Sequence, residues 1–138
     1  MITRDEVMPL LLAACPSFAS TWADLEHDDV HVNDDGTRLH YLDASMFATH
    51  LVELHRSGRD DEVRAAFVVI ERLHLEGDPY VSELATIGYL EDVEGDVAAH
   101  PDELAFFESV LGPESARWWR GLQAFWTGRA PLVRATDG

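Results

Sequence analysis

The chain has 138 residues, with 26 acidic side chains against ten basic ones, and its formal net charge is −16. A field of one negative sign repels nucleic acid and anionic lipid and attracts basic partners. The length fits one domain, the hydrophobic content of 46% can fill a core, and the single cysteine cannot form an internal disulfide. These features predict a soluble cytoplasmic domain that binds neither nucleic acid nor membrane.

The predicted elements begin with a helix over residues 4–14. Thr3 and Glu6 have the spacing of a capping box, and Pro16 ends the helix. The segment Leu12-Ala13-Ala14-Cys15 resembles the cleavage box of a bacterial lipoprotein, but a secretory signal needs a positively charged start and a longer apolar run. We therefore interpret this segment as the end of a helix.

A short second helix is expected from Ser17, followed by an acidic surface loop over residues 27–37 and one short strand over 38–42. Aligning the loop with a calcium-binding loop places Leu42 where a bidentate glutamate should close the site, so a solvated loop is the better interpretation. Asp43 is expected to cap a third helix that ends at Ser57, before Gly58.

The second half of the chain predicts four more helices. A broad apolar arc over residues 61–76 indicates a central helix, with Asp60 or Asp61 as its cap. Asp78-Pro79 starts the next helix, to residue 94, in which Gly88 indicates close approach to a neighbour. Asp102 is expected to cap a helix that ends at Leu111, and a last helix spans about 114–127.

The fold class predicted from these elements is all-α, either a compact bundle or a short HEAT-like stack of about six to seven helices. We expect a single helical domain over residues 1–128 and a flexible C-terminal tail over 129–138.

A metal site is the first catalytic alternative. Glu71 and His74 have the spacing of carboxylate-bridged metal bundles, and His50 and Glu53 carry the same pair in reverse on a neighbouring helix. Such bundles need two correctly ordered pairs, and only one is present. We therefore predict no metal and no cofactor, with a hydrogen-bonded structural role for His74.

Other chemistry finds little support in the sequence. No phosphate-binding glycine loop or nucleophile turn is present, and Cys15 has no nearby positive charge to activate its thiol. The cluster Arg117-Trp118-Trp119-Arg120 could stack nucleobases, but the helical spacing of Trp119, Leu122 and Trp126 favours core packing. The chain is therefore not expected to be an enzyme.

A resemblance rests on the pattern from Glu76-Gly77-Asp78 through Val81, Leu84 and Gly88 to Leu90-Glu91, followed by a last helix rich in tryptophan. This pattern is similar to the second helix of a HEAT-type repeat. More closely, it resembles a family of small, acidic, all-helical bacterial proteins of unknown function. The resemblance implies a link to immunity proteins of bacterial toxins and supplies no catalytic residues.

Acidic residues gather in two stretches that contain no arginine, residues 24–35 and 91–108. We therefore predict a non-enzymatic protein-binding protein, most specifically an immunity- or antitoxin-type inhibitor of a basic bacterial effector. Two alternatives stay open: a metal-dependent bundle enzyme built on Glu53, Glu71 and His74, and a homo-oligomeric scaffold. The predicted partner-binding residues are Asp28, Asp29, Asp34, Asp35, Glu91, Asp92, Glu94 and Asp96.

Overall fold

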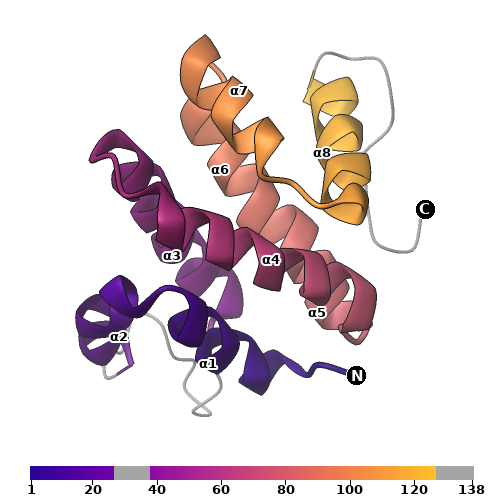
Figure 1. The fold of residues 1–138 in the computed structure, drawn as a ribbon. Coiled ribbons are helices and arrows are strands. Elements are labelled where there is room, and N and C mark those ends of the chain that lie inside the picture. The colour runs from indigo at the N-terminus through magenta and orange to yellow at the C-terminus, as the bar shows by residue number, and fades with distance from the viewer. Residues whose placement is uncertain (27–37, 127–138) are drawn as a thin grey trace.

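The computed structural model describes residues 1–26 and 38–126. If the consecutive segments from Pro79 to Val97 are taken as one helix, these residues form seven helices and no strand, so the all-α prediction is confirmed (Figure 1). The elements are α1 (Arg4–Ala14), a 3-10 turn (Pro16–Phe18), α2 (Ala19–Leu25), α3 (His40–Arg56), α4 (Asp60–Glu76), α5 (Pro79–Glu83), a π-helical segment (Leu84–Leu90), α6 (Glu91–Val97), α7 (Pro101–Ser109) and α8 (Pro113–Trp126).

Helix α4 runs through the middle of the bundle and packs against α1, α3, α5 and α8 (Figure 1). Its inner stripe is fully buried, including Val63, Ile70 and Leu73. The predicted central helix is therefore confirmed, but its apolar arc is narrower than expected. Val68 and Leu75 are each 65% exposed, because α4 has neighbours on most of its sides rather than on all of them.

Two helix starts match their sequence signals. Thr3 and Glu6 form the capping box at the start of α1. The carboxylate of Asp78 accepts a hydrogen bond of 2.9 Å from the backbone N–H of Val81 at the start of α5. The N-terminus is fixed near this point, because the backbone of Ile2 bonds to Glu76 and Asp78 on either side of Gly77.

Three other helix starts were predicted wrongly. Helix α3 begins at His40, so the strand expected over residues 38–42 is absent and Asp43 lies inside the first turn rather than at the cap. Asp43 has instead turned inward to Arg38. Helix α4 begins at Asp60 after Arg59. Asp60 and Asp61 therefore lie in the first turn, where their negative charges interact favourably with the helix dipole. Helix α7 begins at Pro101 rather than after Asp102, because proline fits the first helical position.

The predicted helix over residues 79–94 extends to Val97 and contains a π-helical segment that the sequence did not indicate. Gly88, within that segment, has the packing role expected of it. A Cβ atom there would lie 3.1 Å from the Cβ of Ala44 on α3. The glycine therefore permits the close contact between α3 and the π segment.

No helix within the described ranges combines the length and the apolar character needed to cross a membrane. Residues 127–138 lie outside the described residues, so the tail predicted over 129–138 stays a prediction.

Candidate functional site

Four of the predicted partner-binding residues lie together on α6. Glu91, Asp92, Glu94 and Asp96 line one surface hollow of about 500 Å³, together with Gly95 and Ala98. The other four, Asp28, Asp29, Asp34 and Asp35, lie outside the described residues. We refer to the hollow around Gly95 as the acidic hollow.

The packing of α6 determines how these four residues are arranged around the helix. Val93 and Val97 are fully buried and fix the inner face of α6, which packs against α3. Because each residue turns a helix by about 100°, Glu91, Gly95 and Ala98 share the opposite face. Asp92 and Asp96 follow one side of that face, and Glu94 lies on its other side.

Burial and mutual repulsion disfavour the charged forms of these groups. The pKa of Asp92 is raised to about 6, first by burial and then by the charges of Glu91 and Asp96, against a smaller lowering by the hydroxyl of Ser45. Burial also raises the pKa of Glu91, and burial together with Glu91 raises that of Glu94. The hollow therefore holds its negative charge at neutral pH at the expense of stability.

None of the four carboxylates forms an ion pair within the described residues, although acids elsewhere do. Arginines pair with Asp43, Glu62, Glu76, Glu103 and Glu114. Arg56, which experiences the charge of Asp96, is held by Glu103 through two hydrogen bonds of 2.8 and 2.9 Å. The arrangement leaves the acidic hollow without a counter-charge from this part of the chain.

The residues of the metal alternative have structural partners. The carboxylate of Glu71 accepts hydrogen bonds from the backbone N–H groups of Glu114 (3.0 Å) and Ser115 (2.8 Å), and so caps the start of α8. Both ring nitrogens of His74 are bonded, Nδ1 to Ser115 and Nε2 to Thr86, each at 3.0 Å. Burial lowers the pKa of His74 to about 4, so the imidazole is neutral at pH 7.

The sequence analysis did not predict that Glu71 caps α8, although the sequence indicates that this helix needs a cap. Pro113 starts α8 with no serine, threonine, aspartate or asparagine just before it, so the free N–H groups of that helix need a partner from elsewhere. Within the described residues, no group of three or more His, Cys, Asp or Glu side chains is placed to hold a metal ion.

His50, the other half of the metal pattern, lies beside Ser17 rather than Glu71. Its Nε2 is 2.8 Å from the Ser17 hydroxyl, while the backbone N–H of Ser17 donates to Glu62 at 2.9 Å. Cys15 lies 3.7 Å from the same hydroxyl, and burial raises the pKa of its thiol. A carboxylate beside the serine would repel a developing oxyanion, so the pair is suited to fixing the start of α2 rather than to acyl transfer.

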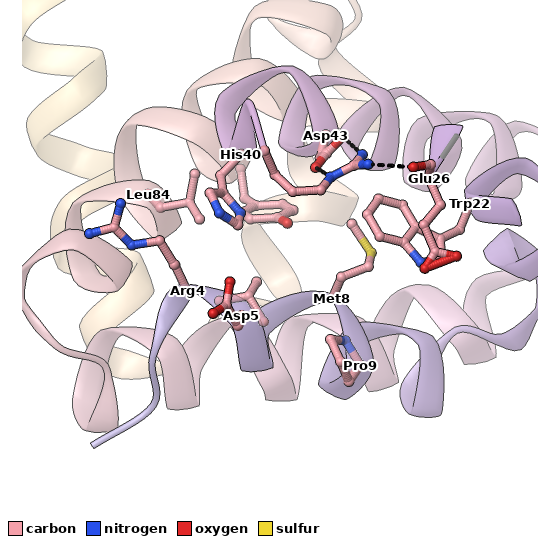
Figure 2. Close-up of a pocket in the computed structure, with 12 residues that line it drawn as sticks. Arg4, Asp5, Met8, Pro9, Trp22, Glu26, His40, Asp43 and Leu84 are labelled. Carbon is pink, nitrogen blue, oxygen red and sulfur yellow. Dashed lines mark hydrogen bonds and ion pairs between the residues drawn. The ribbon is translucent and has the colours of Figure 1, made fainter. Parts of the chain in front are cut away.

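A second cavity, of about 200 Å³, lies between α1, α2, α3 and the π segment (Figure 2). It is smaller than a typical ligand pocket of about 300–1,000 Å³. The guanidinium of Arg38 crosses it to reach Asp43 and the backbone carbonyl of Glu26, and it stacks over the Trp22 ring at 4.6 Å. The guanidinium of Arg38, the main polar group in this cavity, is therefore already bonded to other groups of the protein. The lining residues are Arg4, Asp5, Val7, Met8, Pro9, Trp22, Glu26, Arg38, His40, Asp43, Leu84 and Tyr89.

Burial and like-charge repulsion in the acidic hollow should make the stability of the protein depend on pH. The pKa of Asp92 is about 6 in the folded chain and 3.8 for the unperturbed group, so ionisation of Asp92 opposes folding above pH 6 and has no effect well below 3.8. Asp92→Asn should therefore raise the free energy of unfolding by about 1 kcal/mol near neutral pH, after allowance for solvent screening. Urea denaturation should show the gain disappear as the pH falls to about 4.

Asp24→Asn is the matched control, because Asp24 is an exposed carboxylate on α2. We expect it to change stability by less than about 0.5 kcal/mol. An Asp92→Asn variant less stable than the wild type near neutral pH would show that the carboxylate is stabilising and would contradict this account.

The comparisons with known proteins place the chain in a family without assigning a site. Residues 8–127 match the family described as "Domain of unknown function (DUF7674)". No curated protein and no solved structure matches the chain significantly. The acidic hollow therefore stands on its own geometry as the candidate functional site.

Proposed function

We propose that this chain, which belongs to the DUF7674 family, is a non-enzymatic binding protein that uses the acidic hollow of α6 to dock a basic protein partner. The observation that carries the proposal is the set of four carboxylates left without an ion pair among the described residues, at a cost to stability. Basic side chains of a docked partner would remove that repulsion, and the free energy that it costs in the unbound protein would then strengthen binding.

The more specific form of the proposal is an immunity- or antitoxin-type inhibitor of a basic bacterial effector. Its support is the net charge of −16, which speeds encounter with a basic protein and resembles the phosphate charges that a nuclease recognises. The metal-enzyme alternative loses support, because Glu71 caps α8 and His74 is bonded at both ring nitrogens.

The alternative of a homo-oligomer docked through the C-terminal arginines is less favoured. Arg117 is paired with Glu114 at 3.0 Å and stacks over the ring of Trp118 at 4.4 Å. Arg117 already has partners on its own helix, so this one of the C-terminal arginines is poorly placed to neutralise a second copy.

The experiment is co-expression with the product of the neighbouring gene, followed by affinity measurement with the purified partner. Four substitutions remove the charge of the hollow together: Glu91→Gln, Asp92→Asn, Glu94→Gln and Asp96→Asn. We expect the dissociation constant to rise by about 30-fold, roughly 2 kcal/mol, as several partly desolvated charge pairs are lost.

A second fourfold variant separates this site from the overall charge. Asp24, Glu53, Asp61 and Asp102 are exposed and are changed to the corresponding amides, which also raises the net charge from −16 by four, to −12. Its affinity should fall by less than about threefold. Equal losses in the two variants would reduce the hollow to a share of the general charge, and the absence of any complex would contradict the immunity-type function.

A further inference from the structure

The side chain of Tyr89 is only 1% exposed, yet its hydroxyl has no hydrogen-bond partner among the described residues. Its ring packs edge to face against Phe47, with centroids 5.9 Å apart. Every fully enclosed side-chain nitrogen or oxygen in the described ranges has a hydrogen-bond partner. The Tyr89 hydroxyl is therefore not fully enclosed, and the space that it reaches is the cavity between α1, α2, α3 and the π segment, which Tyr89 lines.

Two more polar side chains on the walls of this cavity lack a partner. Asp5 on α1 and His40 on α3 lie on opposite sides of the cavity (Figure 2). Neither forms a hydrogen bond or an ion pair with another described residue. Burial lowers the pKa of His40 from 6.5, so above pH 7 its ring is neutral, with one donor and one acceptor nitrogen. The cavity thus offers both donors and acceptors to a ligand.

The size of the cavity admits a single ring with a small polar substituent. Its volume is about 200 Å³, whereas a cavity of about 150 Å³ is enough to hold benzene. Val7, Met8 and Leu84 give it buried apolar walls. An aromatic ring would be stabilised there by contact with the methionine sulfur and the aliphatic side chains.

The charged groups of the cavity favour an uncharged ligand. Arg38 is bound to Asp43, and the guanidinium of Arg4 lies 4.0 Å over the ring of Tyr80, which does not line the cavity. An anion would lie near Asp5 and Asp43 without a free guanidinium to neutralise it. A cation would compete with Arg38 for Asp43, the only buried carboxylate in the described lining. A neutral ligand has neither cost.

We propose that this cavity binds a small, uncharged aromatic amide, with its ring against Met8 and Leu84 and its amide group at Tyr89 and His40. The Tyr89 hydroxyl would donate to the amide carbonyl oxygen. The amide N–H groups would donate to the acceptor nitrogen of His40 or to the carboxylate of Asp5. This site is separate from the acidic hollow and does not depend on the proposed docking function.

Three probes of nearly the same shape test both the site and its preference for a neutral ligand. Benzamide is neutral near pH 7.5, benzoate is negative and benzamidine is positive. Titration of the full ¹⁵N-labelled chain with benzamide should give a dissociation constant of about 1 mM or lower. The backbone amides of Val7 and Leu84 and the indole N–H of Trp22 should shift, and the amide of Gly95 should not. Benzoate and benzamidine should bind at least about tenfold more weakly.

Tyr89→Phe removes the hydroxyl and keeps the ring. We expect it to weaken benzamide binding by about fivefold to tenfold, because one buried hydrogen bond to the ligand is lost. The substitution removes no hydrogen bond to another described residue, so the variant should fold normally, which thermal melts check. Tyr80→Phe is the matched control: Tyr80 lies outside the cavity lining, and its loss should change the affinity by less than about twofold.

Three results would overturn the proposal. They are the absence of any shift at about 10 mM benzamide, equal affinities for the three probes, and a Tyr89→Phe variant that binds benzamide as tightly as the wild type. The fourfold variant of the acidic hollow should bind benzamide as the wild type does. A loss of benzamide binding in that variant would place the ligand at the hollow and would also contradict the site in the cavity.

Discussion

Replacing Arg38 with methionine should lower the free energy of unfolding by about 3 kcal/mol, because it leaves a buried carboxylate without its main partner. The guanidinium donates to both oxygens of Asp43, at 2.8 and 3.1 Å, and the Asp43 side chain is only 4% exposed. Arg38 also bonds the backbone carbonyls of Leu25 and Glu26 at the end of α2. One side chain therefore joins α2 to the first turn of α3.

Methionine retains much of the apolar contact with Trp22, so the loss reports on charge and hydrogen bonding rather than on a cavity. Urea denaturation near neutral pH is the measurement. Combining Arg38→Met with Asp43→Asn should recover about half of the loss, since the amide avoids a buried unpaired charge. Arg64→Met is the control: Arg64 is exposed, and its guanidinium lies over the Phe106 ring, 5.4 Å from the ring centroid. If Arg38→Met lowers the free energy of unfolding no more than Arg64→Met does, the Arg38–Asp43 pair does not stabilise the fold.

The second large effect is a pH-dependent loss of stability caused by His74. Its pKa is about 4 in the folded chain and 6.5 for the unperturbed imidazole, so the unfolded state binds a proton more readily. The contribution of the neutral imidazole is complete above pH 6.5 and is lost as the pH falls toward 4. The difference corresponds to about 3 kcal/mol at most.

His74→Gln isolates this effect, because glutamine does not titrate and can still bond to Ser115 or Thr86. Unfolding free energies measured from about pH 7.5 to 4 should fall more steeply for the wild type, and the two curves should converge on the acid side. Glu71 and Glu114 face His74 and are present in both proteins. Parallel curves would mean that His74 is not held neutral by burial.

Much of the architecture could be predicted from local signals. The capping box of Thr3 and Glu6 and the Asp78-Pro79 start are short-range features, and each formed as expected. The starts of α3, α4 and α7 were misplaced for a common reason. An aspartate that favours a cap can also lie in the first turn, where it interacts favourably with the helix dipole. Asp43 lies there in α3 and binds Arg38 instead of capping the helix.

The sequence shows the clustering of the acidic residues but not their surroundings. It places Glu91, Asp92, Glu94 and Asp96 in a stretch that contains no arginine, and their role in binding a partner stays a prediction. It could not show that Glu94 is nine-tenths buried or that the nearby Arg56 is engaged by Glu103. The Arg56–Glu103 pair joins side chains that are 47 residues apart in the chain.

The sequence alone determined the helical class, the central helix and the strong negative charge, because these follow from residue spacing and composition. Tertiary structure decided which charges are neutralised and which remain. It placed Glu71 at the start of α8 and left the acidic hollow without an ion pair among the described residues. Helical periodicity is a local property, whereas the pairing of charges depends on which helices pack together.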